Sequence, residues 1–262
     1  MAGDEGTEPL LRCEGVSKSF GAVHALYRVD FEVRPGEVMA LVGDNGAGKS
    51  TLIKGIVGIY PFDEGTTTFD GKQVRIHGPK DAADLGIEVV YQDLALADNL
   101  DVVANMFLGR EETKTGLLDE VSMEKRAQET LQGLKVTTLR SVRQTVAGLS
   151  GGQRQAVAVA KAVLYDSKMV ILDEPTAALG VAQTRQVLDL VKRLAEQGYA
   201  VVLISHNLHD IFEVADRITV LRLGQQVAVL DRRDTTQEGV VKAITAGEMK
   251  HVPGMDDEVV EA

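Results

Sequence analysis

Apolar residues along the chain form short continuous runs that alternate with stretches of helical spacing. Three runs, Val38–Val42, Met169–Leu172 and Ala200–Ile204, contain no charged side chain. Such runs are typical of strands buried on both faces of a parallel sheet. Apolar residues recur every three or four positions over Gly151–Tyr165 and Val181–Gln197, which predicts amphipathic helices. The pattern predicts an α/β fold, a mainly parallel sheet with helices on both faces.

Alternating positions separated by turn residues predict a smaller antiparallel β subdomain near the start of the chain. Its expected strands cover 10–16, 25–33, 66–69 and 73–76. The other expected elements are a strand over 86–92, helices over 101–108, 122–134, 207–215 and 236–246, and a closing hairpin over 217–230. The interpretation is one domain over 10–247, with a catalytic core (10–92 and 161–247) interrupted by a helical insert (93–160).

Composition excludes several classes of protein. With 262 residues and 44% apolar residues the chain can bury a sizeable core, and it has no apolar run long enough for a membrane span. The formal net charge of −11 argues against a nucleic-acid partner. Much of that charge lies in the acidic tails, 1–9 and 248–262, which we expect to be disordered. The single cysteine, Cys13, cannot form an internal disulfide and favours a reducing, cytoplasmic setting.

A glycine-rich turn follows the first buried run and precedes a helical stretch. Its residues are Gly43, Asp44, Asn45, Gly46, Ala47, Gly48, Lys49, Ser50 and Thr51. In this context glycines let backbone N–H groups surround a polyphosphate, and the helix start adds partial positive charge. Lys49 can reach the terminal phosphates, and the Ser50 hydroxyl suits Mg²⁺. We predict a nucleoside-triphosphate site rather than a glycine turn that binds nothing.

Two further patterns agree with such a site. Asp173 and Glu174 follow a buried strand, where the first can hold Mg²⁺ and the second can deprotonate an attacking water. The alternative is a pair of charges that stabilise a helix start. A second group, Leu149, Ser150, Gly151, Gly152 and Gln153, opens a predicted helix. Alone this group could be a simple capping turn, but its position in the chain, after Lys49 and before Asp173, favours a functional role.

With these motifs in place, residues 10–245 resemble the nucleotide-binding subunit of an ATP-binding cassette (ABC) transporter, a P-loop NTPase. The group 149–153 matches the signature of that family. Gln92 matches its Q-loop glutamine, a catalytic and Mg²⁺-binding position. His206 matches its switch histidine, and Phe20 matches the aromatic residue that stacks on adenine. Read without the resemblance, Gln92 is a strand-end polar residue, His206 neighbours a helix cap, and Phe20 is a core residue.

The resemblance implies a mechanism and a set of partners. Two copies of the cassette would enclose two ATP molecules, with the signature of one copy completing the site of the other. Integral membrane permease subunits would convert the cycle into transport, with the chain peripheral to the cytoplasmic face of the inner membrane. The segment from Gln92 to Leu108 would dock on the permease, or its leucines would only pack the insert onto the core.

A finer resemblance, carried by 91–96, 105–111 and 174–180, is to the ATPases of bacterial monosaccharide importers of the ribose, xylose and fructose type. It implies a sugar-binding protein as an indirect partner. One position departs from the wider family, because Gly180 stands where an aspartate is usual and puts coupling between the two sites in doubt. The alternatives are an importer of another small solute and a non-transport ABC ATPase.

Overall fold

A six-stranded, mainly parallel sheet forms the centre of the computed structural model, which describes residues 8–246. The predicted tails, 1–9 and 248–262, lie outside the described residues except for residues 8 and 9. Across the sheet the strands are β12 (Gln225–Asp231), β11 (Arg217–Arg222), β3 (Val38–Gly43), β10 (Ala200–Ile204), β9 (Met169–Asp173) and β6 (Ile87–Val90). All neighbours are parallel except β11 and β12, the predicted closing hairpin.

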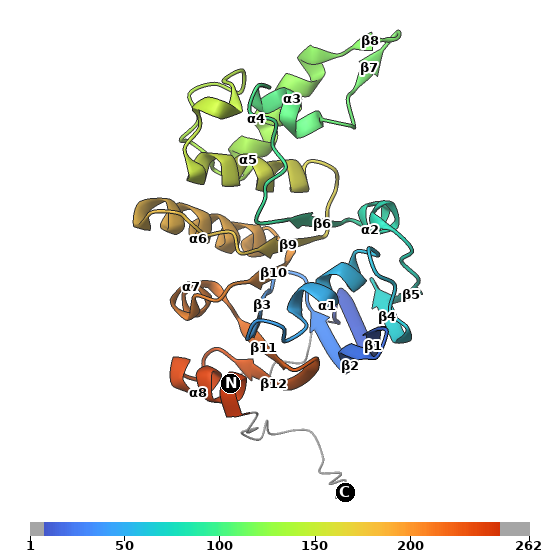
Figure 1. Cartoon of the computed structure of the whole chain (residues 1–262). Coiled ribbons are helices and arrows are strands. Elements are labelled where there is room, and N and C mark those ends of the chain that lie inside the picture. The colour runs from blue at the N-terminus through green and yellow to red at the C-terminus, as the bar shows by residue number, and fades with distance from the viewer. Residues whose placement is uncertain (1–7, 247–262) are drawn as a thin grey trace, which may run out of the picture.

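The two faces of this sheet bury different sets of side chains, because alternate residues of a strand point to opposite sides. From β3, Val38 and Ala40 pack in a cluster with α6 (Val181–Glu196), α7 (Leu208–Val214) and α8 (Gln237–Ala246). Met39 and Leu41 pack on the other face against α1 (Lys49–Ile56). Figure 1 shows these helices on opposite sides of the sheet. Helices on both faces are therefore confirmed.

The antiparallel β subdomain covers the same face as α1. Its strands, in order, are β2 (Val23–Val33), β1 (Leu11–Phe20), β4 (Glu64–Phe69) and β5 (Lys72–Val74). The first strand is longer than predicted and reaches Phe20, since its pairing with β2 continues to the hairpin tip, where Phe20 lies opposite Val23. The helix α2 (Pro79–Leu85), which the sequence pattern did not indicate, leads into β6.

Residues 93–160 contain α3 (Val102–Phe107), α4 (Glu120–Gly133) and most of α5 (Gly151–Val163), together with a small hairpin of β7 (Thr113–Lys114) and β8 (Leu117–Leu118). Figure 1 shows α3, α4 and the hairpin gathered at one end of the molecule. The apolar cluster that covers the sheet continues into this part of the chain, through Val102, Met106 and Val157. The insert is thus anchored by a continuous apolar core.

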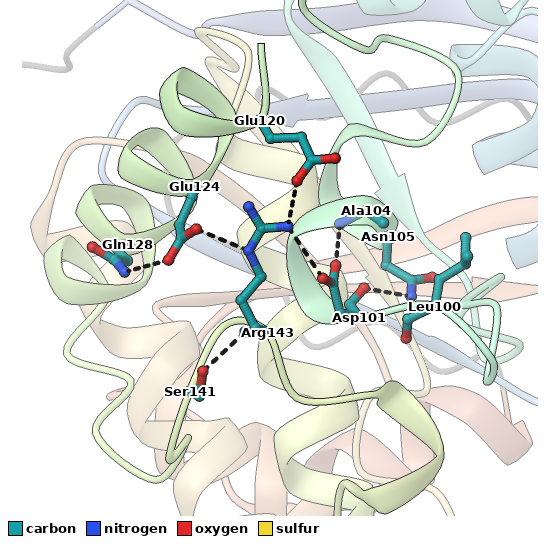
Figure 2. A network of polar contacts seen from close by, with 9 residues as sticks. All are labelled: Leu100, Asp101, Ala104, Asn105, Glu120, Glu124, Gln128, Ser141 and Arg143. Atoms are coloured by element: carbon teal, nitrogen blue, oxygen red, sulfur yellow. Dashed lines mark hydrogen bonds and ion pairs between the residues drawn. The ribbon is translucent and has the colours of Figure 1, made fainter. Parts of the chain in front are cut away.

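Polar contacts fix the starts of the insert's helices. The predicted start of α4 at Ser122 is wrong by two residues, because Asp119 caps the helix by accepting a hydrogen bond from the Ser122 N–H at 3.1 Å. Asp101 caps α3 in the same way, through Ala104 (2.7 Å). Arg143 lies between these two helix starts (Figure 2).

In residues 8–246 no helix combines the length and apolar character that a membrane crossing requires.

Candidate nucleotide-binding site

The glycine-rich turn joins β3 to α1, as the pattern predicted. Gly46 and Gly48 have positive φ, +81° and +103°. A Cβ at Gly43 would lie 2.3 Å from the Leu221 carbonyl oxygen, and one at Gly48 would lie 2.9 Å from that of Ala25. Neighbouring backbone therefore leaves no room for side chains, and the N–H groups of the turn stay close to the start of α1.

Lys49 is the first residue of α1, and its ammonium group lies over the turn. Its Nζ donates hydrogen bonds to the carbonyl oxygens of Gly43 (2.7 Å) and Asp44 (3.0 Å). Burial lowers the pKa of Lys49, and the negative charges of Glu174, Asp44 and Asp173 oppose that shift. The turn and the acidic end of β9 therefore face one another across this ammonium group.

A cavity of about 270 Å³ opens beside the turn. Three of its lining residues, Ser50, Gln92 and Asp173, are the predicted metal ligands. Its other lining residues, which were not among the predicted site residues, are Ile53, Lys54, Tyr91 and Asp93. The cavity thus brings together residues from α1, β9 and the segment after β6.

The donor set of this cavity fits Mg²⁺. A hydroxyl, an amide and a carboxylate are the oxygen ligands that this ion takes, and it commonly binds one or two carboxylates plus phosphate oxygens and water. No cluster of three or more histidine, cysteine or acidic residues suited to a metal occurs in the described part of the chain. Burial, followed by the charge of Glu174, raises the pKa of Asp173, while Lys49 and Lys54 oppose the shift. A nearby cation would keep this carboxylate ionised.

The two predicted catalytic residues that follow β9 and β10 lie in contact. The Glu174 carboxylate is 2.8 Å from His206 Nδ1. Glu174 is largely buried, with 18% of its side chain exposed, whereas His206 is 78% exposed. Glu174 has a φ of +51°, and its N–H donates to the Ile204 carbonyl at 2.9 Å. That bond holds the backbone of Glu174 in a sparsely populated conformation, of the kind found at functional sites.

The loop after Glu174 is tied to α7 by a bond that sequence reasoning missed. Thr176 donates from its hydroxyl to the carboxylate of Asp210 at 2.7 Å. Asp210 is only 3% exposed. An acidic residue in the first turn of a predicted helix usually lies at the surface. The only sequence signal that Asp210 lies near the site was its position four residues after His206.

The signature residues form a helix start away from the cavity. Ser150 caps α5 in a capping box, in which its hydroxyl accepts from the Gln153 N–H and Gln153 Oε1 accepts from the Ser150 N–H. A Cβ at Gly151 would lie 2.7 Å from Leu179. None of residues 149–153 lines the cavity described above. Within one chain they therefore take no part in lining the cavity that contains Ser50 and Asp173.

Phe20 lies at the tip of the β1–β2 hairpin with 44% of its surface exposed, which excludes the core alternative. Its ring meets Tyr60 edge to face, with centroids 5.2 Å apart, and Lys18 Nζ lies 5.7 Å from its centroid. The strand β2 returns from this tip and brings Ala25 against Gly48 of the phosphate loop. Phe20 is therefore an exposed aromatic ring on the hairpin that adjoins the loop.

Gly180 is the N-cap of α6 and has an extended backbone, with φ −74° and ψ 161°. A Cβ there would meet nothing within 4 Å. An aspartate would fit at this position.

In the segment after Gln92, Leu94 and Leu96 are half-buried and pack against the larger apolar cluster, so these leucines help to hold the insert on the core.

Three transport ATPases are similar to this chain in amino-acid sequence. The chain is 47% identical to the fructose import ATP-binding protein FrcA of Rhizobium meliloti, over 91% of this chain and 94% of that protein. It is 46% identical to the xylose/arabinose import ATP-binding protein XylG of Sulfolobus acidocaldarius, over 90% and 94%. It is 40% identical to the galactofuranose transporter ATP-binding protein YtfR of Escherichia coli, over 95% of this chain but only 49% of that protein.

Solved structures agree. The ADP conformation of an ATP-binding cassette from an ABC transporter is 28% identical, covers 91% of this chain and 96% of that one, and gives a TM-score of 0.78. A dimeric cassette in a post-hydrolysis state, bound to ADP and Pi, is 25% identical, covers 86% and 100%, and gives a TM-score of 0.70. The family model described as ABC transporter matches residues 26–177. This chain belongs to the ABC transporter family, as one of its ATP-binding, ATP-hydrolysing cassettes.

Proposed function

We propose that this ATPase powers the import of a simple sugar. The observation that carries the proposal is the match, over nine-tenths of the chain, to two proteins named for fructose import and for xylose/arabinose import. The imported sugar would not touch this chain, so the proposal concerns the class of solute rather than one compound. The chain would sit at the cytoplasmic face of the membrane, held there by permease subunits and served indirectly by a sugar-binding protein.

Glu174 would act as the general base of ATP hydrolysis. Its carboxylate stands at the end of β9, next to Asp173 and in contact with His206. It can accept the proton of an attacking water, while His206 holds the carboxylate through Nδ1. Gln92 lines the same cavity as Asp173 and would contact the terminal phosphate and the metal.

The phosphates would lie against residues 43–51, with Lys49 turning from the loop carbonyls to the β- and γ-phosphates. Phe20 would stack on the adenine. Ser50, Gln92 and Asp173 would hold Mg²⁺, which supplies positive charge to the phosphate oxygens. The fit of the cavity's oxygen donors supports this assignment.

A second copy would complete each site. Residues 149–153 are separate from the cavity in their own chain, and the dimeric cassette among the solved relatives supports a pairing of two such domains. Ser150 and the N–H groups of Gly151 and Gly152 would then face the γ-phosphate held by the partner. The start of α5 favours an anion there.

Sugar uptake tests the proposal. Cells that lack this chain are supplied with the wild-type protein or with Glu174→Gln, and uptake of radiolabelled fructose, xylose and ribose is measured. The proposal expects uptake of one of these sugars to return with the wild type only. If the cells that lack the chain lose uptake of a non-sugar solute instead, the chain serves an importer of another class. Unchanged uptake of every solute tested would contradict a transport role.

A further inference from the structure

Two irregular segments of the insert are joined side by side. One follows Gln92, and the other ends at the signature. Backbone hydrogen bonds of 3.0–3.2 Å connect the second segment to the first, from Val146 N–H to Leu100 and from Ala147 N–H to Asp98, and to the start of α3, from Val102 N–H to Gln144 and from Val103 N–H to Val142. The second segment contains only one turn of 3₁₀ helix, Val146–Gly148. Its position therefore depends on contacts with neighbouring elements rather than on its own regular structure.

Arg143 belongs to the second segment, and Figure 2 shows its side chain among the carboxylates of Asp101, Glu120 and Glu124. Its Nε donates to Glu124 at 2.8 Å, and its Nη1 lies 3.2 Å from Glu120 and 3.5 Å from Asp101. These carboxylates belong to the cap of α3 and to the first turns of α4. One guanidinium group thus joins the segment before the signature to two helices of the insert.

The segment that Arg143 holds leads directly into the signature. The chain runs from Arg143 through the 3₁₀ turn to Ser150, seven residues later. Gln153 donates from Nε2 to the Thr138 carbonyl at 2.6 Å, and Arg154 forms an ion pair with Asp98 at 2.9 Å. The start of α5 is therefore held from the same pair of segments. A shift of the segment around Arg143 would move Ser150.

We propose that Arg143 is a positioning residue for Ser150, and hence for the nucleotide held by the partner copy. This inference rests on the proposed pairing of two cassettes. Arg143 lies in the insert, seven residues before Ser150, and its ion pairs are with carboxylates of the insert, none of which belongs to the phosphate loop. Removing its charge should therefore leave nucleotide binding by a single chain intact and slow hydrolysis in the partner's site.

Complementation between two inactive copies separates these sites. Copy one carries Ser150→Arg and keeps its own phosphate loop and Glu174. Copy two carries Glu174→Gln and keeps its signature. Neither pairs with itself to form a working site, but a mixed pair has one, made from the catalytic residues of copy one and the signature of copy two. Arg143→Gln is then added to either copy, and ATP hydrolysis of the mixture is measured with copy two in excess.

The proposal expects a fall on the order of tenfold when Arg143→Gln is in copy two, since a misplacement of about 1 Å at a reacting group can cost about 100-fold. In copy one the same change should have no effect. Arg143→Lys in copy two should restore activity only in part, because an ammonium group cannot span three carboxylates as a guanidinium does. Arg140→Gln is the matched control, since Arg140 is exposed and no ion pair of it is found among the described residues.

An equal fall in both copies would mean a merely structural role, and a fall only in copy one would mean an effect on the chain's own site. No fall in either copy would mean that Arg143 does not position the signature. Each of these three results overturns the inference. If the unmodified mixture shows no activity, the pairing itself is refuted and the inference with it.

Discussion

Asn105 is the buried amide that holds the segment after Gln92 onto α3. Its side chain is fully buried. Its Oδ1 accepts from the Ala97 N–H at 2.7 Å, and its Nδ2 donates to the carbonyls of Ala97 (3.0 Å), Asp101 (2.9 Å) and Leu100 (3.3 Å). Figure 2 shows the amide turned toward Leu100 and Asp101.

The loss of stability caused by Asn105→Ala depends on which of the surrounding polar groups keep a hydrogen-bond partner. All three carbonyls keep another partner: Leu100 N–H for Ala97, Asn105 N–H for Asp101, and Val146 N–H for Leu100. Only the Ala97 N–H loses its one partner among the described residues. One orphaned donor costs about 1–3 kcal/mol, and each lost hydrogen bond about 0.5–1.5. One orphaned donor and three further lost hydrogen bonds together give an expected loss of about 2.5–7.5 kcal/mol in the free energy of unfolding.

Denaturant unfolding of the isolated chain measures this loss. Asn105→Asp should be worse than Asn105→Ala, because a buried carboxylate would face three carbonyl oxygens and could donate nothing to them while ionised. Asn99→Ala, an exposed change in the same segment, should stay within about 0.5 kcal/mol of the wild type. The reasoning is refuted if Asn105→Ala matches the wild type, or if the aspartate variant is the more stable of the two.

Three further changes have definite expected outcomes. Gly180→Asp should raise the free energy of unfolding by about a few tenths of a kcal/mol, since aspartate caps helices slightly better than glycine. The Hill coefficient of ATP hydrolysis should also rise if this position couples the two sites. An unchanged coefficient would mean that Gly180 only starts the helix. Phe20→Ala should weaken ATP binding by about 1–3 kcal/mol but leave tripolyphosphate binding unchanged, and equal losses for both ligands in calorimetry would contradict stacking. Leu96→Glu should lower the melting temperature of the isolated chain, because Leu96 packs against the apolar cluster; a stable variant that no longer assembles with the permease would instead assign Leu96 to docking.

Long runs and local motifs were predictable because their signals lie within a few residues. The strand Val38–Gly43, the turn to Lys49 and the capped start of α5 all follow the pattern. The contact of Glu174 with His206 also follows from topology, since both residues come after neighbouring parallel strands.

Other features carry no local signal. The hairpin of β7 and β8 has strands of two residues, too short for any periodicity. The Arg143 partners lie 42, 23 and 19 residues away in the chain. Charged residues in a helical stretch ordinarily indicate a solvated face, so nothing in the order of residues connects Arg143 to Asp101. Such pairings appear only when the helices are packed.

The central claim is that ATP joins two copies of this chain through Ser150, and the mass of the protein in solution tests it most directly. Glu174→Gln removes the proposed general base, which should slow turnover by about 10²–10⁴-fold and so preserve the bound ATP. With ATP and Mg²⁺, light scattering of this variant should shift from the 28.2 kDa monomer toward twice that mass. Adding Ser150→Arg should abolish the shift while nucleotide binding persists. A Glu174→Gln protein that stays monomeric with saturating ATP, or a double variant that still pairs, would contradict the account.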